Sequence, residues 1–117
     1  MPRTVLTKST APGATDTLGA DLTLDAADDT NFNEFTLTGN EVVIAYNSGV
    51  AVALVTITSF PDRFGRSGDI AKSVAAGEAA VFGPFSQEGW RQAGGALYLQ
   101  ADAATVLFGV ISLTVVA

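Results

Sequence analysis

Turn-forming residues recur along this chain at short intervals, and their spacing limits what the chain can fold into. Clusters rich in Gly, Pro, Asn or Asp lie at residues 11–13, 38–41, 47–49, 67–69 and 76–78. These residue types favour turns because Gly accepts positive φ, Pro fixes φ, and Asn and Asp bond to nearby backbone. The segments between them show no apolar residues at helical spacing with caps at both ends. The spacing therefore predicts short strands and no helix longer than a turn or two.

Alternation of apolar and polar residues supports this prediction in the middle of the chain. "EFTLT" at residues 34–38 and "EVVIAY" at residues 41–46 each place apolar side chains on one face of a strand. "AVALVTITSF" at residues 51–60 alternates in the same way, and "NSG" at residues 47–49 has the composition of a hairpin turn. We expect a hairpin over residues 41–59.

Three further segments are expected to complete the fold. "AAVFGPF" at residues 79–85 begins as a strand and meets Pro84, which cannot donate a ladder hydrogen bond, and "ALYLQA" follows at residues 96–101. The apolar run at residues 104–117 is shorter than the roughly 20 residues of a membrane-spanning helix. Its Thr, Val and Ile content fits a strand covered on both faces. The predicted fold is an all-β antiparallel β-sandwich, jelly-roll-like.

The length of 117 residues predicts one hydrophobic core. We divide the chain into an N-terminal arm at residues 1–15, possibly extended, and a single sandwich domain at residues 16–117. The arm holds Arg3 and Lys8, and its Val5 and Leu6 suit a strand added to a neighbouring subunit's sheet. On this hypothesis, residues 2–12 are dispensable for folding.

Composition excludes several kinds of chemistry. The chain has no cysteine and no histidine, which removes disulfides, thiol nucleophiles, Ser-His-Asp catalysis and the common zinc sites. A net charge of −6 disfavours nucleic-acid binding, because the phosphate backbone would be repelled. A mean hydropathy of +0.35 is high for a soluble monomer and suggests apolar surface buried between subunits. We expect a non-enzymatic protein without cofactor or metal.

An acidic run, "DLTLDAADDTNFNE" at residues 21–34, contains side-chain oxygens that could bind calcium. Its spacing does not match an EF-hand loop, so the favoured interpretation is a solvated turn in which Asp and Asn bind their own backbone. Asp28 and Asp29 also form no promising acid–base pair, because neighbours on a strand point to opposite faces. The candidate oxygen ligands are Asp21, Asp25, Asp28, Asp29 and Asn31.

Two loops contain the remaining candidates. Arg63 and Arg66 flank Phe64 in "FPDRFGRSGD" at residues 60–69. They could clamp a phosphate or carboxylate, but local Arg–Asp pairing is the favoured interpretation. Trp90, beside Arg91, is expected to fill the core, and the alternatives are an exposed interface anchor or a ring that stacks on a sugar.

The segments "TNFNEFTLTGNEVVIAYNSG", "VTITSFPDRFGRSGDI" and "AGEAAVFGPFSQEGWRQAGGALYLQA" resemble small virion proteins of tailed phages, of the head decoration (capsid cement) type. The resemblance spans roughly residues 20–110. Its most specific parts are "GRSGDI" and a pattern formed by Gly83, Pro84, Phe85, Gly89, Trp90, Gln92, Gly95, Leu97 and Tyr98.

The resemblance implies a β-sandwich that binds the outside of an assembled capsid and stabilises it. The partner would be the major capsid protein, and the location would be the virion exterior after assembly in the host cytoplasm. We expect a homo-oligomer, with a trimer as the first hypothesis because capsids offer threefold positions. A tail-associated virion protein, and a carbohydrate-binding or adhesive sandwich using Trp90, Tyr98 and loop carboxylates, remain alternatives. The candidate capsid or subunit interface residues are Arg3, Val5, Leu6, Lys8, Arg63, Phe64, Arg66, Trp90 and Arg91.

Overall fold

The computed structural model describes residues 3–11 and 21–113, and its regular structure is entirely β. No helix that could cross a membrane occurs in these two ranges. The strands are β1 (Thr4–Val5), β2 (Lys8–Thr10), β3 (Leu24–Ala26), β4 (Asn33–Thr36), β5 (Glu41–Asn47), β6 (Ala53–Thr58), β7 (Ile70–Val74), β8 (Ala79–Phe82), β9 (Ala96–Ala101) and β10 (Val106–Ser112).

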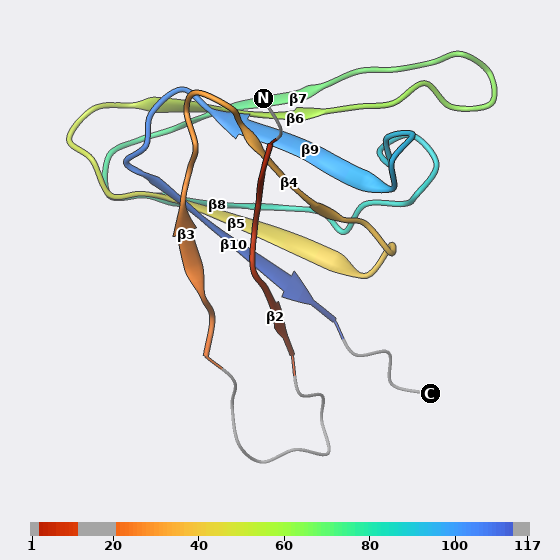
Figure 1. Cartoon of the computed structure of the whole chain (residues 1–117). Helices are drawn as coiled ribbons and strands as arrows, with labels where there is room; N and C mark the ends of the chain where they lie inside the picture. The colour runs from red at the N-terminus through yellow and green to blue at the C-terminus, as the bar shows by residue number, and fades with distance from the viewer. Residues whose placement is uncertain (1–2, 12–20, 114–117) are drawn as a thin grey trace.

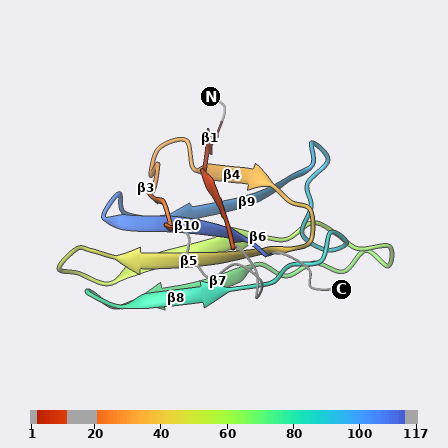
Figure 2. The same cartoon turned by 90° about the horizontal axis from the view of Figure 1, so that it is seen from below.

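The strands form two sheets that pack against each other as a β-sandwich (Figures 1 and 2). Sheet A has the order β1-β4-β9-β6-β7, and sheet B has the order β2-β10-β5-β8, with β3 also paired to β10. The predicted all-β sandwich is confirmed, although β1–β4 and β2–β10 are parallel rather than antiparallel pairs. The jelly-roll connectivity stays a prediction.

The core between the sheets takes alternate residues from each strand, and in β5 it does not take the all-apolar face identified in the sequence. In β5, Val43 and Ala45 are buried while Val42 and Ile44 point outward. In β6 the buried positions are Ala53, Val55 and Ile57. Because successive side chains of a strand point to opposite faces, one face of each sheet supplies the shared core.

The predicted hairpin over residues 41–59 is wrong. β5 lies in sheet B between β10 and β8, and β6 lies in sheet A between β9 and β7. The segment after β5 therefore crosses from one sheet to the other, and buried Asn47 holds this corner. Its amide Nδ2 donates to the carbonyls of Ala51 at 2.8 Å and Val74 at 2.9 Å, and its Oδ1 accepts from Gly49 N at 3.0 Å.

The strand predicted within residues 104–117 is present as β10. β10 pairs along its full length with β5, and its other edge pairs with β2 and β3. Val106, Phe108 and Val110 face the core, and the leucines at positions 22 and 24 lie against the outward side of Gly109. β10 ends at Ser112, and residues 114–117 of the predicted strand lie outside the described residues.

The N-terminal segment does not extend away from the sandwich as an arm. Residues 3–11 supply β1 to sheet A and β2 to sheet B, so they cross from one sheet to the other. Between the two strands, Leu6 is only 3% exposed and belongs to the core. Leu6 is therefore not an accessible interface residue in this arrangement, because its apolar side chain is already buried within its own chain. The expected boundary after residue 15 lies outside the described residues.

Candidate functional site

The candidate site lies at one end of the sandwich, where two connections meet. The loop between β6 and β7 projects beyond the sheets, and the segment between β8 and β9 lies beside it (Figure 1). A backbone bond from Phe60 N to Gly89 O at 2.8 Å joins them. Between them is an open cleft of about 530 Å³, lined by Ser59, Asp62, Arg63, Phe64, Arg66, Ser67, Gly68, Ser86, Glu88, Gly89 and Trp90.

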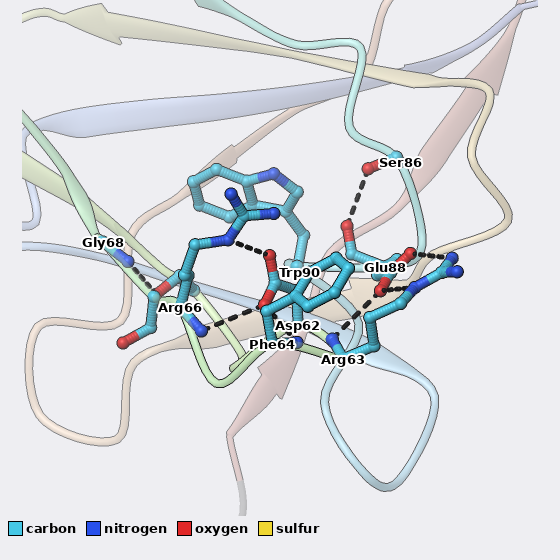
Figure 3. Close-up of a pocket in the computed structure, with 11 residues that line it drawn as sticks. Asp62, Arg63, Phe64, Arg66, Gly68, Ser86, Glu88 and Trp90 are labelled. Atoms are coloured by element: carbon cyan, nitrogen blue, oxygen red, sulfur yellow. Dashed lines mark hydrogen bonds and ion pairs between the residues drawn. The ribbon is translucent and has the colours of Figure 1, made fainter.

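Asp62 holds the tip of the β6–β7 loop in one shape (Figure 3). Its Oδ1 accepts from Phe64 N at 2.9 Å and Arg66 N at 3.0 Å, and its Oδ2 accepts from Arg66 Nε at 3.0 Å. Gly65, at φ 76°, closes the turn by donating to Asp62 O at 2.9 Å. An aspartate directly after Pro61 is a turn signal, since its carboxylate can bind backbone amides ahead of it.

Arg63 connects the loop to the opposite wall of the cleft. Its Nε and Nη2 donate to Oε2 and Oε1 of Glu88 at 2.9 and 2.8 Å, and its backbone N donates to Oε2 at 3.0 Å. Two parallel N–H bonds to one carboxylate form the bidentate geometry that fixes both side chains. The sequence prediction of local arginine pairing is confirmed for Arg66 with Asp62, whereas Arg63 pairs with a residue 25 positions away.

Phe64 is displayed at the tip of this constrained loop. Its side chain is 72% exposed, and the Arg66 guanidinium carbon lies 5.0 Å from its ring centroid. A guanidinium within about 6 Å of a ring face is attracted by the π electrons. The result is an exposed aromatic ring with one guanidinium stacked beside it and a second, on Arg63, attached to the far wall.

Trp90 lies at the inner side of the cleft and is half-buried (Figure 3). Its ring meets that of Phe85 edge to face, with centroids 5.2 Å apart. Phe85 is buried, so Phe85 fills the core position that we expected Trp90 to fill, and Trp90 packs against it from the rim. The tryptophan is thus neither a complete core side chain nor a free surface anchor.

The charges of the cleft are balanced locally. Hydrogen bonds from the Arg66 backbone, and then from Phe64 and the Arg66 side chain, lower the pKa of Asp62 despite partial desolvation. Hydrogen bonds from the Arg63 side chain and backbone lower the pKa of Glu88 to about 2. Both carboxylates are therefore ionised at neutral pH and bound to guanidinium groups, which makes them poor proton donors.

Arg91 faces a second, smaller cleft on the other side of the Arg63–Glu88 pair. This space of about 410 Å³ also includes Arg63 and Glu88 in its lining. The Arg91 guanidinium lies against Gly95, where an added Cβ would come within 3.2 Å of it. The structure thus brings five of the sequence candidates to one end of the molecule, namely Arg63, Phe64, Arg66, Trp90 and Arg91.

The N-terminal candidates lie elsewhere and are mostly engaged within the fold. The Arg3 guanidinium carbon lies 4.0 Å from the Tyr98 ring centroid, and its Nη1 donates to Asn33 O at 3.2 Å. Lys8 Nζ donates to Glu41 Oε2 at 2.8 Å. Of the four N-terminal candidates, only Val5 presents a largely exposed apolar side chain.

The acidic run forms the predicted local turn only around Asp28, whereas its residues 24–26 form β3 and Asp25 accepts a hydrogen bond from Thr7 N at 2.8 Å. Asp28 Oδ1 accepts from Asn31 N at 2.9 Å and Thr30 N at 3.1 Å, and Asp28 Oδ2 accepts from Thr4 Oγ1 at 2.6 Å. These bonds, led by that from Asn31 N, lower the pKa of Asp28. Within residues 3–11 and 21–113, no three Asp or Glu side chains gather in a way that would hold a metal ion.

Comparison of the chain with family models, with curated proteins and with solved structures finds no match. Sequence reasoning missed Glu88 as a partner of Arg63. No local signal marks Glu88, because only the fold places it opposite Arg63.

Proposed function

We propose that this chain is a non-enzymatic binding module of a tailed-phage virion, of the head decoration type, that attaches to the major capsid protein on the outer surface of the head. The proposal rests on the resemblance described above and on the β-sandwich fold. The structure adds a candidate contact element, the loop that displays Phe64. The contact would stabilise the shell by mass action, because a protein that binds only the assembled state favours that state.

The rigid display of Phe64 is the observation that carries the proposal. An exposed aromatic side chain is costly for solubility, and here the loop beneath it is fixed by six hydrogen bonds that Arg63, Phe64 and Arg66 donate to the carboxylates of Asp62 and Glu88. Ordering a loop before binding removes an entropy cost from the binding step. Aromatic and arginine side chains are also the residues that most often dominate binding energy at interfaces.

The proposed contact can be tested by sedimenting the protein with mature heads of the phage that encodes it. Phe64→Ala removes the ring but keeps the Asp62 bond to the backbone N of residue 64, so the loop should stay folded. Val50→Ala is the matched control, since Val50 is 100% exposed on the β5–β6 connection. We expect Phe64→Ala to weaken head occupancy by about tenfold or more, and Val50→Ala to leave it unchanged.

Three outcomes would contradict the proposal. The wild-type chain could fail to bind heads at all, or it could bind tails but not heads, as a tail-associated protein would. It could also bind glycans on an array with saturable affinity and not bind heads, which the carbohydrate-binding alternative predicts. If the chain does bind heads, cryo-electron microscopy of the decorated heads would locate the contact. A contact that does not include the β6–β7 loop would exclude Phe64 as its anchor.

A further inference from the structure

The outward face of sheet B is apolar, whereas that of sheet A is polar. On sheet B, the outward side chains of the three longest paired strands are Val42, Ile44, Tyr46, Val81, Leu107 and Ile111. None of them carries a charge. On sheet A, the corresponding outward positions of β4, β6 and β9 include Glu34, Thr36, Thr56, Thr58 and Gln100.

Strand register makes these residues one continuous surface. Ile44 pairs with Val81 on one side and with Gly109 on the other, and the next rows pair Val42 with Ile111 and Tyr46 with Leu107. Directly opposed residues on one face of a sheet have their Cβ atoms about 5 Å apart. The side chains therefore touch across β8, β5 and β10, which lie next to one another in Figure 2.

The leucines before and within β3 extend this surface over β10. Leu24 pairs with Gly109, and a Cβ added to Gly109 would lie 2.9 Å from Leu24 Cδ2 and 3.1 Å from Leu22 Cδ1. The absence of a side chain at Gly109 thus lets both leucines lie close to the sheet. Both remain partly exposed, so they widen the apolar surface instead of burying it.

We propose that this outer face of sheet B is where a second copy of this chain binds, in a two-fold dimer that packs the two sheets face to face. The chain carries a net charge of −6, so two copies repel each other through most of their surfaces. An uncharged face is the surface through which they can meet without that cost. A two-fold contact uses the same patch on both copies, and therefore places one apolar face against an identical one.

The size of the face suits a weak, reversible dimer. Strands β3, β5, β8 and β10 have 3, 7, 4 and 7 residues, and at about 3.3 Å per residue and about 4.8 Å between strands they give a projected area of about 330 Å². A standard interface buries about 800 Å² on each partner, and apolar patches of about 300–600 Å² on monomers are often functional. A trimer, by contrast, needs two different complementary surfaces on each subunit, which a single flat face does not provide.

Sedimentation of the full chain over a concentration series up to about 100 µM tests this inference. We expect the mass to rise from monomer to dimer with concentration. Val81→Lys, at a position that is 66% exposed on the face, should raise the dissociation constant at least tenfold. Leu54→Lys is the matched control: it adds the same charge to an outward strand position that is 42% exposed, but on sheet A, and should leave dimerisation unchanged.

Circular dichroism establishes that each variant is folded, and Tyr46→Lys replaces Val81→Lys if the latter unfolds. A wild-type chain that stays monomeric up to about 100 µM, or that forms a trimer, overturns the inference. So does an equal effect of the two lysine substitutions, because the effect would then not depend on which sheet carries the lysine. The inference is independent of the capsid proposal. A chain that dimerises but does not bind heads contradicts only the capsid proposal, and a chain that binds heads as a monomer contradicts only the dimer.

Discussion

Lys8→Met should destabilise the fold by an amount that depends on pH, because it removes the cation beside a buried carboxylate. Glu41 begins β5 and is 0% exposed, and its carboxylate accepts from Lys8 Nζ, Thr38 N and Thr38 Oγ1 at 2.8, 2.9 and 2.6 Å. Methionine keeps the apolar length of the lysine side chain and lacks only the ammonium group. The substitution thus leaves a buried charge without its counter-ion, a change that is strongly destabilising.

The magnitude follows from the pKa of Glu41. Burial alone raises this pKa, but hydrogen bonds from Lys8 and Thr38 outweigh burial and lower it from 4.5 to about 2. A lowered folded-state pKa gives stability that is present above pH 4.5 and is lost as the pH falls toward 2. Its full value is about 3 kcal/mol at pH 7, and linkage reduces it to about 1 kcal/mol at pH 3. Lys8→Met should therefore cost up to about 3 kcal/mol at pH 7 and much less at pH 3.

Urea unfolding, followed by the fluorescence of Trp90, measures this difference at pH 7, 5 and 3. Trp90 is the single tryptophan and is half-buried against Phe85, so its emission should report loss of the fold. Lys72→Met on β7 is the control, because Lys72 is exposed. If Lys8→Met costs the same free energy at pH 7 and pH 3, the loss comes from packing and the electrostatic reasoning is refuted.

The remaining predictions concern the core and the cleft. Leu6→Ala should destabilise the isolated chain by about 2–4 kcal/mol in urea unfolding, and a change below about 0.5 kcal/mol would mean that the N-terminal segment does not pack as described. Phe85→Ala should cost about 3–5 kcal/mol and Trp90→Ala clearly less, since only Phe85 is fully buried; the reverse order in thermal melts would contradict this. In a carbon-detected NMR titration, the Glu88 carboxyl should titrate near pH 2, and its pKa should rise clearly in Arg63→Gln, which removes the side-chain bonds but keeps the backbone bond; an unchanged pKa would show that the ion pair does not form in solution.

Strand positions were predictable from the sequence more reliably than strand partners. Alternation in residues 53–58 correctly predicted which side chains are buried, because the two-residue period is a local property of a strand. In residues 41–46 the all-apolar face of Val42, Ile44 and Tyr46 points outward instead, and the opposite face is buried. The same pattern does not say which sheet a strand joins. "NSG" has the composition of a hairpin turn, but Asn47 uses its side chain to bond Ala51 and Val74 at a corner between sheets.

Two further differences have the same origin in contacts between residues distant in sequence. Leu6 lies between short polar strands and reads locally as part of an exposed arm, yet parallel pairing to β4 and β10 places it in the core. Arg63 and Glu88 are 25 residues apart, and only the joining of two loops at one end of the sandwich brings them together. The pairing of Arg66 with Asp62 was predictable from local sequence, because the two residues are only four positions apart.

The two proposed surfaces lie on different parts of the molecule, and this has a consequence for binding. The Phe64 loop extends from sheet A beyond one end of the sandwich, whereas the proposed dimer face is the flank of sheet B (Figure 1). Pairing through sheet B leaves both Phe64 loops uncovered, so a dimer presents two copies of the proposed capsid contact. Two linked contacts gain avidity wherever a shell's spacing matches their separation. Val81→Lys should then weaken head occupancy without touching the Phe64 loop, and unchanged occupancy for a monomeric Val81→Lys chain would show that each copy binds alone.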